Sequence, residues 1–450
     1  MVMTPSSVAI KKNDAESNPV PIKYDVDMSH VAAVILGGGE GTRLVPLTTT
    51  RCKPAICFGG KYRLIDVPMS NAINSGCFKI FLITQFLSAS LHQHIFRTYR
   101  LGNCSPGYIE LLTAEQRPSQ KIWFQGTADA IRQNIEYLSE ASVEYFLILS
   151  GDQLYNMDFR KMVRFAKETK ADLVIAALPV AVEEAKRMGL LKLNEDRFIT
   201  KFCEKPQTQE LLDQMEMPEV TMAHLGPHTN PARKYLGSMG IYLFKREALL
   251  SLLRQDLRED FGKHLIPTKV SLGNVAAFLH EGYWEDIGTI SSFYQANIAL
   301  TAPNPHFDCY DVRNPIISPS YHLPGPKISN THVNQSIICE GAHVEADEIS
   351  HSIIGLRAVL KAGCIIRNSY IMGNDYFHAP IPSEHLPVTP QIGENCIIDR
   401  AIIDKHAYLG RGVQLLNKKK LDHYTSDHVY IRDGIIVVPR GAVLPDGFVI

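Results

Sequence analysis

The 450-residue sequence lacks the features that mark several classes of protein. Its apolar runs fall well short of the roughly 20 residues that span a bilayer, so we expect no membrane segment. Acidic and basic residues nearly cancel and leave a formal net charge of −1, which argues against a nucleic-acid-binding surface. The sequence therefore predicts a protein with neither a membrane nor a nucleic acid as its partner.

Cysteines are few and follow no pattern. There are nine, an odd number, and none forms a Cys-x-x-Cys pair, which argues against a zinc site and suits a reducing compartment. Cys52 and Cys57, the closest pair, are expected to be buried thiols.

Residues 1–27 lack the apolar segment of a signal peptide and are too acidic for a transit peptide. We expect a cytoplasmic protein with a disordered tail at 1–27.

The remaining chain is long for a single core, and its pattern changes near residue 300. Over residues 28–300, short apolar runs alternate with amphipathic segments. This alternation predicts an α/β domain with a mostly parallel, Rossmann-like sheet and helices on both faces. The expected strands are Val31–Leu36, Lys79–Thr84, Tyr145–Leu149, Asp172–Ala177 and Met239–Phe244, and the expected helices include Thr127–Leu138 and Phe159–Lys167.

A different architecture is predicted for the C-terminal part. Residues 301–327 contain six prolines and no clear periodicity, which indicates a linker. Over 328–450, an aliphatic residue recurs every sixth position with a small residue four places later, a pattern typical of a triangular parallel β-helix. Cys364 and Cys396 then point inward, while residues 373–391 and 416–428 interrupt the period and are expected to be protruding loops.

The glycine-rich segment after the first strand is the first candidate site. Gly37, Gly38, Gly39 and Gly41 follow Val31–Leu36, and consecutive free amides in such a turn can form an anion site. The segment is neither a Walker A loop nor a dinucleotide fingerprint, because Thr-Arg follows Gly41. Arg43 and Lys53 suit phosphate oxygens, so we interpret the loop as a triphosphate site. A tight turn with exposed basic residues is the alternative.

Asp152 is the second candidate, since Ser150-Gly-Asp follows another expected strand. The carboxyl ends of parallel strands meet at one edge of a sheet, so Asp152 and the glycine loop are expected to share one crevice. An N-cap or turn role is the commoner use of aspartate at such a position.

The motifs along the chain resemble, in order, those of the sugar-1-phosphate nucleotidyltransferases, and more specifically the ADP-glucose pyrophosphorylases. That family also carries a left-handed β-helix behind its catalytic domain. The matching segments are Gly37–Leu44, Lys53–Ala55, Arg63–Asp66, Trp123–Ala130, Ser150–Asp152, Phe202–Pro206, Gly237–Tyr242 and Tyr283–Gly288.

The resemblance implies that ATP and glucose 1-phosphate give ADP-glucose and pyrophosphate, the committed step of glycogen or starch synthesis. Arg43 and Lys53 would hold the ATP phosphates, and Asp152 and Asp286 would bind Mg²⁺. Lys205 would hold the sugar phosphate. Glucose hydroxyls would contact Gly189, Glu204 and Ser238, and the adenosine would contact Leu36, Gly37, Gly38, Gln116, Phe124, Gly126 and Thr127.

The resemblance also implies a tetramer, expected to be a homotetramer although some members of the family are heteromeric, that is activated by a sugar phosphate. The activator would bind basic residues, some between the domains and some at the extreme C-terminus. Arg51, Arg63 and Arg440 occupy plausible positions for that effector. Thr50 stands where many members carry lysine, and Cys57 where some carry histidine, so the identity of the effector stays open.

Three alternatives remain at this point. The same fold could use another base and make UDP- or GDP-sugars, or it could be a regulatory subunit without activity. A β-helix acyltransferase would need a catalytic histidine, and nothing marks one among those at 343, 351, 378 and 406.

Overall fold

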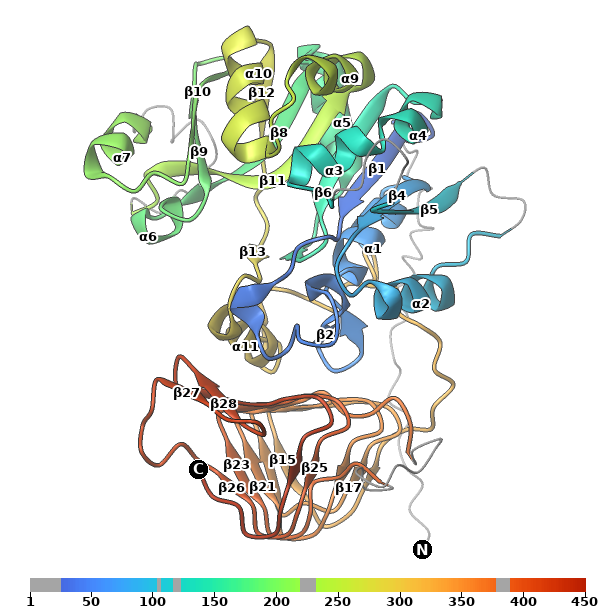
Figure 1. The fold of residues 1–450 in the computed structure, drawn as a ribbon, viewed down its shortest axis with the longest axis vertical. Helices are drawn as coiled ribbons and strands as arrows, with labels where there is room; N and C mark the ends of the chain where they lie inside the picture. The colour runs from blue at the N-terminus through green and yellow to red at the C-terminus, as the bar shows by residue number, and fades with distance from the viewer. Residues whose placement is uncertain (1–25, 103–106, 116–122, 219–231, 378–388) are drawn as a thin grey trace, which may run out of the picture.

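The computed structural model describes residues 26–102, 107–115, 123–218, 232–377 and 389–450. Figure 1 shows two bodies, an upper one of helices and strands (blue to yellow) and a lower one of stacked coils (orange to red). The tail predicted at 1–27 lies outside the described residues, except for its last two. Within the described ranges, every helix is too short or too polar to cross a lipid bilayer.

The upper body is built on a nine-stranded sheet of order β10-β9-β11-β6-β1-β4-β5, in which β8 pairs with β11 and β12 pairs with β8. Its centre, β5-β4-β1-β6, is parallel, as predicted. The long β11 runs antiparallel to β6, β8 and β9, a direction that its apolar sequence alone does not encode. The strands are β1 (Val31–Leu36), β4 (Lys79–Thr84), β5 (Tyr108–Thr113), β6 (Tyr145–Ser150), β8 (Leu173–Val180), β9 (Gly189–Leu193), β10 (Ile199–Glu204), β11 (Tyr235–Lys245) and β12 (Val275–Leu279).

Helices cover both faces of this sheet, as predicted, because side chains along β1 alternate between two apolar cores. Val31, Ala33 and Ile35 face one core, and Ala32 and Val34 face the other. The helices are α1 (Asp66–Asn74), α2 (Ala89–Thr98), α3 (Thr127–Gln133), α4 (Ile135–Glu140), α5 (Phe159–Thr169), α6 (Val182–Ala185), α7 (Gln209–Met215), α9 (Arg246–Gln255), α10 (Ile266–Leu272) and α11 (Ile290–Ala299).

The helix expected over Thr127–Leu138 is divided into α3 and α4 at Asn134. The Asn134 side-chain amide donates to the Ala130 carbonyl at 2.8 Å, a local bond of the kind that competes with continued helix. Short elements complete this body: η1 (Thr42–Leu44), η2 (Lys53–Ala55), β2 (Cys57–Phe58), β3 (Tyr62–Arg63), β7 (Gln153–Tyr155), η3 (Phe261–Leu265) and β13 (Trp284–Asp286).

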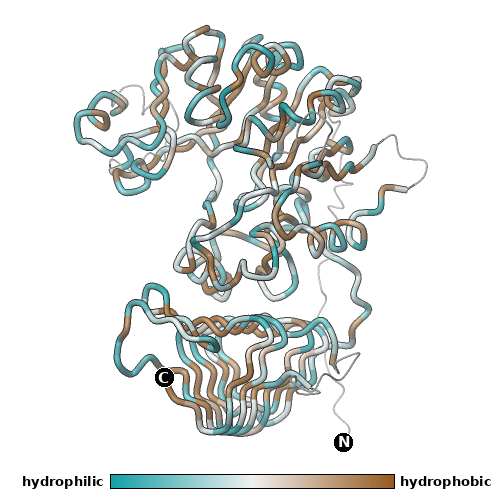
Figure 2. The backbone as a smooth tube through the Cα atoms, in the orientation of Figure 1, coloured by the Kyte–Doolittle hydropathy of each residue, from teal (hydrophilic) through white to brown (hydrophobic). Residues whose placement is uncertain are grey.

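The lower body confirms the predicted β-helix, since its strands stack in parallel along three faces. Figure 2 shows apolar segments recurring at matching places in successive coils. The residues of the six-residue pattern, among them Ile354, Leu360 and Leu409, are buried in one interior core. Cys364 and Cys396 are fully buried there, as predicted.

The first face contains β14 (Lys327–Ile328), β17 (His343–Val344) and β20 (Val359–Leu360), together with the pair β25 (Tyr408–Leu409) and β30 (Val443–Leu444). The second contains β15 (His332–Asn334), β18 (Glu348–Ser350), β21 (Ile365–Arg367), β23 (Ile397–Asp399) and β26 (Gln414–Leu415). The third contains β16 (Ile337–Ile338), β19 (Ile353–Ile354), β22 (Tyr370–Ile371), β24 (Ala401–Ile403), β29 (Ile435–Val438), β28 (Tyr430–Arg432) and β27 (His423–Thr425).

The segment expected to be a loop at 416–428 contains a strand instead. β27 and β28 form an antiparallel hairpin that extends the third face, and β28 pairs antiparallel with β29. The six-residue pattern describes only parallel coils, so it could not reveal this pairing. Of the loop expected at 373–391, residues 378–388 lie outside the described residues.

The two bodies share a packed interface. α11 packs on β22 and β29, and the Tyr294 hydroxyl donates to the Asn368 carbonyl at 2.6 Å. The Arg51 guanidinium, 2% exposed, lies 2.6 Å from the Asp404 carboxylate. Between α11 and β14 the chain contains no helix or strand, and the linker bounds of 301–327 stay a prediction.

Candidate active site

The glycine loop follows β1 and opens onto a large cleft of about 1550 Å³. The Gly37 amide donates to the Ile83 carbonyl at 2.8 Å and so continues the sheet. In the described part of the chain, the amides of Gly38 and Gly39 donate to no protein acceptor. Free amides in such a turn favour an anion. Leu36 and Gly38 line the cleft, whereas Gly37 is buried and does not line it.

Gly41 fixes the path of the loop toward the basic residues. Its φ of 67° is in the left-handed region, and an added Cβ would come within 2.9 Å of the Thr48 side chain. The chain then turns into η1, which carries Arg43, and η2, which carries Lys53. Both side chains line the cleft, so the loop brings amides and cations to one place.

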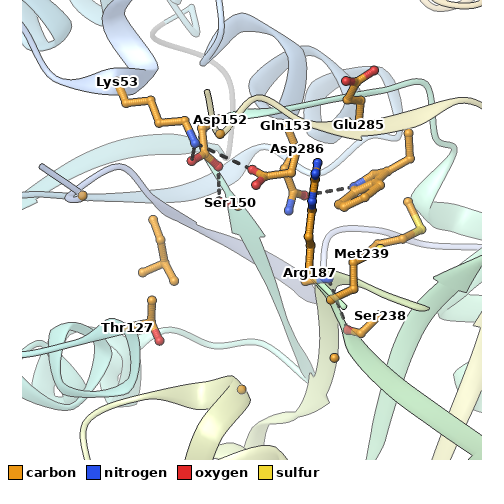
Figure 3. Close-up of a pocket in the computed structure, with 18 of the residues that line it drawn as sticks. Lys53, Thr127, Ser150, Asp152, Gln153, Arg187, Ser238, Met239, Glu285 and Asp286 are labelled. Atoms are coloured by element: carbon orange, nitrogen blue, oxygen red, sulfur yellow. Dashed lines mark hydrogen bonds and ion pairs between the residues drawn. The ribbon is translucent and has the colours of Figure 1, made fainter. Parts of the chain in front are cut away.

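Lys53 joins two carboxylates from different parts of the sheet edge (Figure 3). Its ammonium lies 2.5 Å from Asp152 and 3.7 Å from Asp286. Asp152 follows β6, and the antiparallel pairing of β13 with β7 sets Asp286 opposite Gln153. This register explains why two aspartates far apart in sequence converge. The crevice predicted for the glycine loop and Asp152 is therefore present.

The pKa values of the two carboxyls move in opposite directions. Burial by itself would raise the pKa of Asp152, but the Lys53 ammonium outweighs it and lowers this pKa below its ordinary value. For Asp286, burial and then the neighbouring Asp152 charge raise the pKa. Lys53 thus offsets one negative charge, and the site retains an attraction for further positive charge.

The donor set suits Mg²⁺. Mg²⁺ is often held in proteins by one or two carboxylates together with substrate phosphates. Asp152 and Asp286 already converge on a cation, the Lys53 ammonium. Within the described residues, no group of three or more Asp, Glu, His or Cys side chains could hold a metal. An ion bound here would therefore complete its ligands with water and phosphate oxygens.

The opposite wall contains the residues predicted to contact sugar. Gly189 pairs with Glu204 across β9 and β10, and a Cβ at Gly189 would lie 2.8 Å from a Glu204 oxygen. The Lys205 ammonium lies 3.3 Å from Glu204. Lys205 has a φ of 45°, a costly left-handed conformation that is concentrated at functional sites. Ser238, on β11, lines the same wall.

The residues expected near the adenosine meet at the start of α3. The Phe124 amide donates to the Gln85 side chain at 2.6 Å. An added Cβ at Gly126 would lie 2.5 Å from the Glu259 carbonyl, and the Thr127 hydroxyl accepts from the Phe261 amide. Phe124, Gly126 and Thr127 all line the cleft. Gln116 lies outside the described residues.

The cleft also contains residues that the sequence did not single out. The Trp284 indole donates to the Gln153 side chain at 3.3 Å, and the Tyr283 hydroxyl donates to Glu285. These aromatic and acidic residues belong to the segment Tyr283–Gly288, from which only Asp286 was predicted. Arg187 also lines the cleft, and no motif surrounds it.

The three arginines expected to bind an effector each contact a different protein partner. The Arg51 side chain is buried against Asp404, which leaves it no opening to an anion in this conformation. Arg63 donates to the Ser90 carbonyl at 2.9 Å, and Arg440 lies 3.2 Å from Asp375. Their effector role stays a prediction.

Two models of known families match the chain. A nucleotidyl transferase model matches residues 32–302. A model of the GLGC left-handed parallel β-helix domain matches residues 321–449. The first covers the body that contains the cleft, and the second covers the stacked coils.

Proposed function

Because the chain belongs to the nucleotidyl transferase family, we propose that it transfers the adenylyl group of ATP to glucose 1-phosphate, giving ADP-glucose and pyrophosphate. The matched domains support a sugar-phosphate nucleotidyltransferase activity. The observation that carries the proposal is the convergence of Lys53, Asp152 and Asp286 beside a loop of free amides. A chain that had lost catalysis would have no need to keep all of these groups.

On the nucleotide side, the chain's own residues neutralise and orient the triphosphate. Gly38 and Gly39 line the cleft, and their unbonded amides suit phosphate oxygens. Arg43 and Lys53 neutralise the charge that develops on the departing pyrophosphate. Lys53 exchanges its carboxylate partners for phosphate oxygens as the nucleotide binds.

On the sugar side, Lys205 holds the phosphate whose oxygen attacks the α-phosphorus in line, while Glu204 accepts hydrogen bonds from glucose hydroxyls. Both reactants are anions, so holding them in attacking geometry accounts for much of the acceleration. Asp152 and Asp286 would hold Mg²⁺, which when bound neutralises charge on the phosphate oxygens.

The choice of base and the regulation belong to the proposal as well. Phe124, Gly126 and Thr127 line the cleft, which supports their proposed contact with the adenine and its ribose. The GLGC-type coil domain supports the ADP-glucose branch. We propose a sugar-phosphate activator that acts at the interface of the two bodies, and a homotetramer in the cytoplasm. The same cleft accepting UTP or GTP is the second candidate.

The test is pyrophosphate release by the purified chain with Mg²⁺, glucose 1-phosphate and each of four nucleoside triphosphates. Release with ATP well above that with UTP, GTP or CTP supports the adenylyl proposal, and a preference for UTP overturns it. Each reaction is repeated with fructose 1,6-bisphosphate and with 3-phosphoglycerate. No release under any condition overturns the catalytic proposal in favour of a regulatory subunit.

A further inference from the structure

The cations that line the cleft differ in their partners; they are Arg43, Lys53, Arg187, Lys205 and Arg233. Lys53 contacts two aspartates, and Lys205 contacts Glu204. Within the described residues, the Arg187 guanidinium has no carboxylate within ion-pair distance and no hydrogen-bond acceptor, although it lines the cleft. An arginine left unpaired at the wall of a charged site is available to a ligand.

The fold places Arg187 next to Lys205. Arg187 lies in the turn between α6 and β9, and its amide is fixed by a hydrogen bond to the Glu184 carbonyl at 2.9 Å. The Lys205 amide donates to the carbonyl of Met188, the next residue along, at 3.1 Å. Figure 3 shows the Arg187 side chain extending into the pocket on the side of Asp286 and Gln153. The two cations therefore border one part of the cleft.

The carboxylates around Arg187 and Lys205 indicate that a bound phosphate would need a second cation. Glu183, Glu184 and Glu204 line the same wall, and the Lys205 ammonium is already partly neutralised by Glu204. A sugar phosphate dianion that approached Lys205 alone would meet a surplus of negative charge. A guanidinium presents paired N–H donors that match two phosphate oxygens, which an ammonium does not.

We propose that Arg187 and Lys205 together bind the phosphate of the sugar 1-phosphate. This part of the cleft would then select a sugar that carries a phosphate. The inference rests on the proposed function, whose residue assignments do not include Arg187. Lys205 supplies a point charge beside the reacting oxygen, and Arg187 supplies the directional contact that fixes the orientation of the phosphate.

The experiment compares Arg187→Ala with Lys186→Ala. Lys186 is the adjacent residue in the same turn, carries the same charge, is exposed and does not line the cleft. We expect Arg187→Ala to raise the KM for glucose 1-phosphate by about 10-fold or more, the scale of a lost charge-assisted hydrogen bond. The KM for ATP should stay within about twofold in both variants, and Arg187→Lys should be intermediate because it keeps charge without the paired donors.

Two results would overturn the inference: an unchanged KM for glucose 1-phosphate in Arg187→Ala, or a rise in the KM for ATP alone. Calorimetric titration of glucose 1-phosphate into wild type and Arg187→Ala separates this from a failure of the proposed function, because it needs no turnover. If wild type binds glucose 1-phosphate but shows no turnover, weaker binding by Arg187→Ala in this titration still supports the inference, and equal binding overturns it. If wild type does not bind it, the inference is overturned.

Discussion

Single residues in the cleft were predictable where their chemistry is tied to a local pattern. Asp152 and the glycine loop each follow a buried strand, and both line the cleft. Arg187 follows no such pattern. Its proposed contact with phosphate depends on the pairing of β9 with β10 and on the ion pairs that Lys53 and Lys205 already form with carboxylates. Arg51 was expected to meet an effector, and its partner Asp404, 353 residues away, could not be identified from the sequence.

Asp152→Asn should lower turnover by at least about 100-fold, since it removes one preorganised electrostatic contact at the reacting phosphates. The amide keeps the size of the side chain but not the charge that balances Lys53. Steady-state kinetics with ATP and glucose 1-phosphate measure the effect. Asp196→Asn, in an exposed turn before β10, is the control and should leave turnover unchanged. A loss of less than about fivefold in Asp152→Asn would contradict the assignment.

Lys205→Ala should chiefly raise the KM for glucose 1-phosphate, because a phosphate contact already made in the ground state is lost. Lys201→Ala provides the comparison, since Lys201 lies on β10, which ends just before Lys205, and its ammonium contacts the exposed Gln214 side chain instead. Initial rates at varied sugar phosphate give both constants. If Lys205→Ala leaves this KM unchanged, Lys205 does not hold the sugar phosphate.

At the scale of elements, sequence periodicity predicted the strands and coils that recur regularly, and it failed for the elements that break the regular arrangement. The six-residue pattern indicated the coils because each aliphatic residue must stack on the next. The β27–β28 hairpin breaks that pattern, and its antiparallel bonds left no periodic mark. The parallel centre of the sheet was likewise predictable from alternation, whereas the direction of β11 depends on the strands beside it.

Adjacent coils are joined on the second face by Glu348 of β18 and Arg367 of β21, whose side chains lie 2.6 Å apart. Hydrogen bonds from Arg367 lower the pKa of Glu348 from its ordinary 4.5 to about 2. A carboxyl with a depressed folded-state pKa stabilises the fold above its unfolded pKa, and this stability is lost as the pH falls through the folded value. The contribution should therefore be complete above about pH 5 and gone below about pH 2.

We expect Glu348→Gln to unfold at slightly lower urea concentration than wild type at pH 7, and the difference to shrink as the pH is lowered from 5 toward 2. The effect should be small because both side chains are partly exposed. Urea unfolding followed by circular dichroism measures it. Glu345→Gln, at an exposed position between β17 and β18 of the same coil, should show no such trend. A difference that does not change with pH would contradict the role given to the pair.

At the scale of the whole molecule, the catalytic body and the coils are joined through groups that lie close to the cleft. Arg51 is two residues before Lys53, so the segment that supplies the central cation is also the one attached to the β-helix. Met372 and Tyr370, from the coils, belong to the same apolar cluster as Val31, Ala33 and Ile35 of β1. We therefore expect a displacement of the coils to shift the segment that carries Lys53, and this coupling is a physical basis for the proposed regulation.

The buried pair of Arg51 and Asp404 tests that coupling. Burial alone would lower the pKa of Arg51, but the Asp404 charge outweighs it, so the guanidinium stays charged and dependent on its partner. Asp404→Ala leaves that charge unpaired and should destabilise the protein by about 3–5 kcal/mol, measured by urea unfolding. Arg51→Met with Asp404→Leu removes both charges and should recover most of that stability. Because the double variant still lacks the polar link, its turnover should respond less to an activator than wild type does. An equal response in the two proteins would show that the link carries stability without carrying regulation.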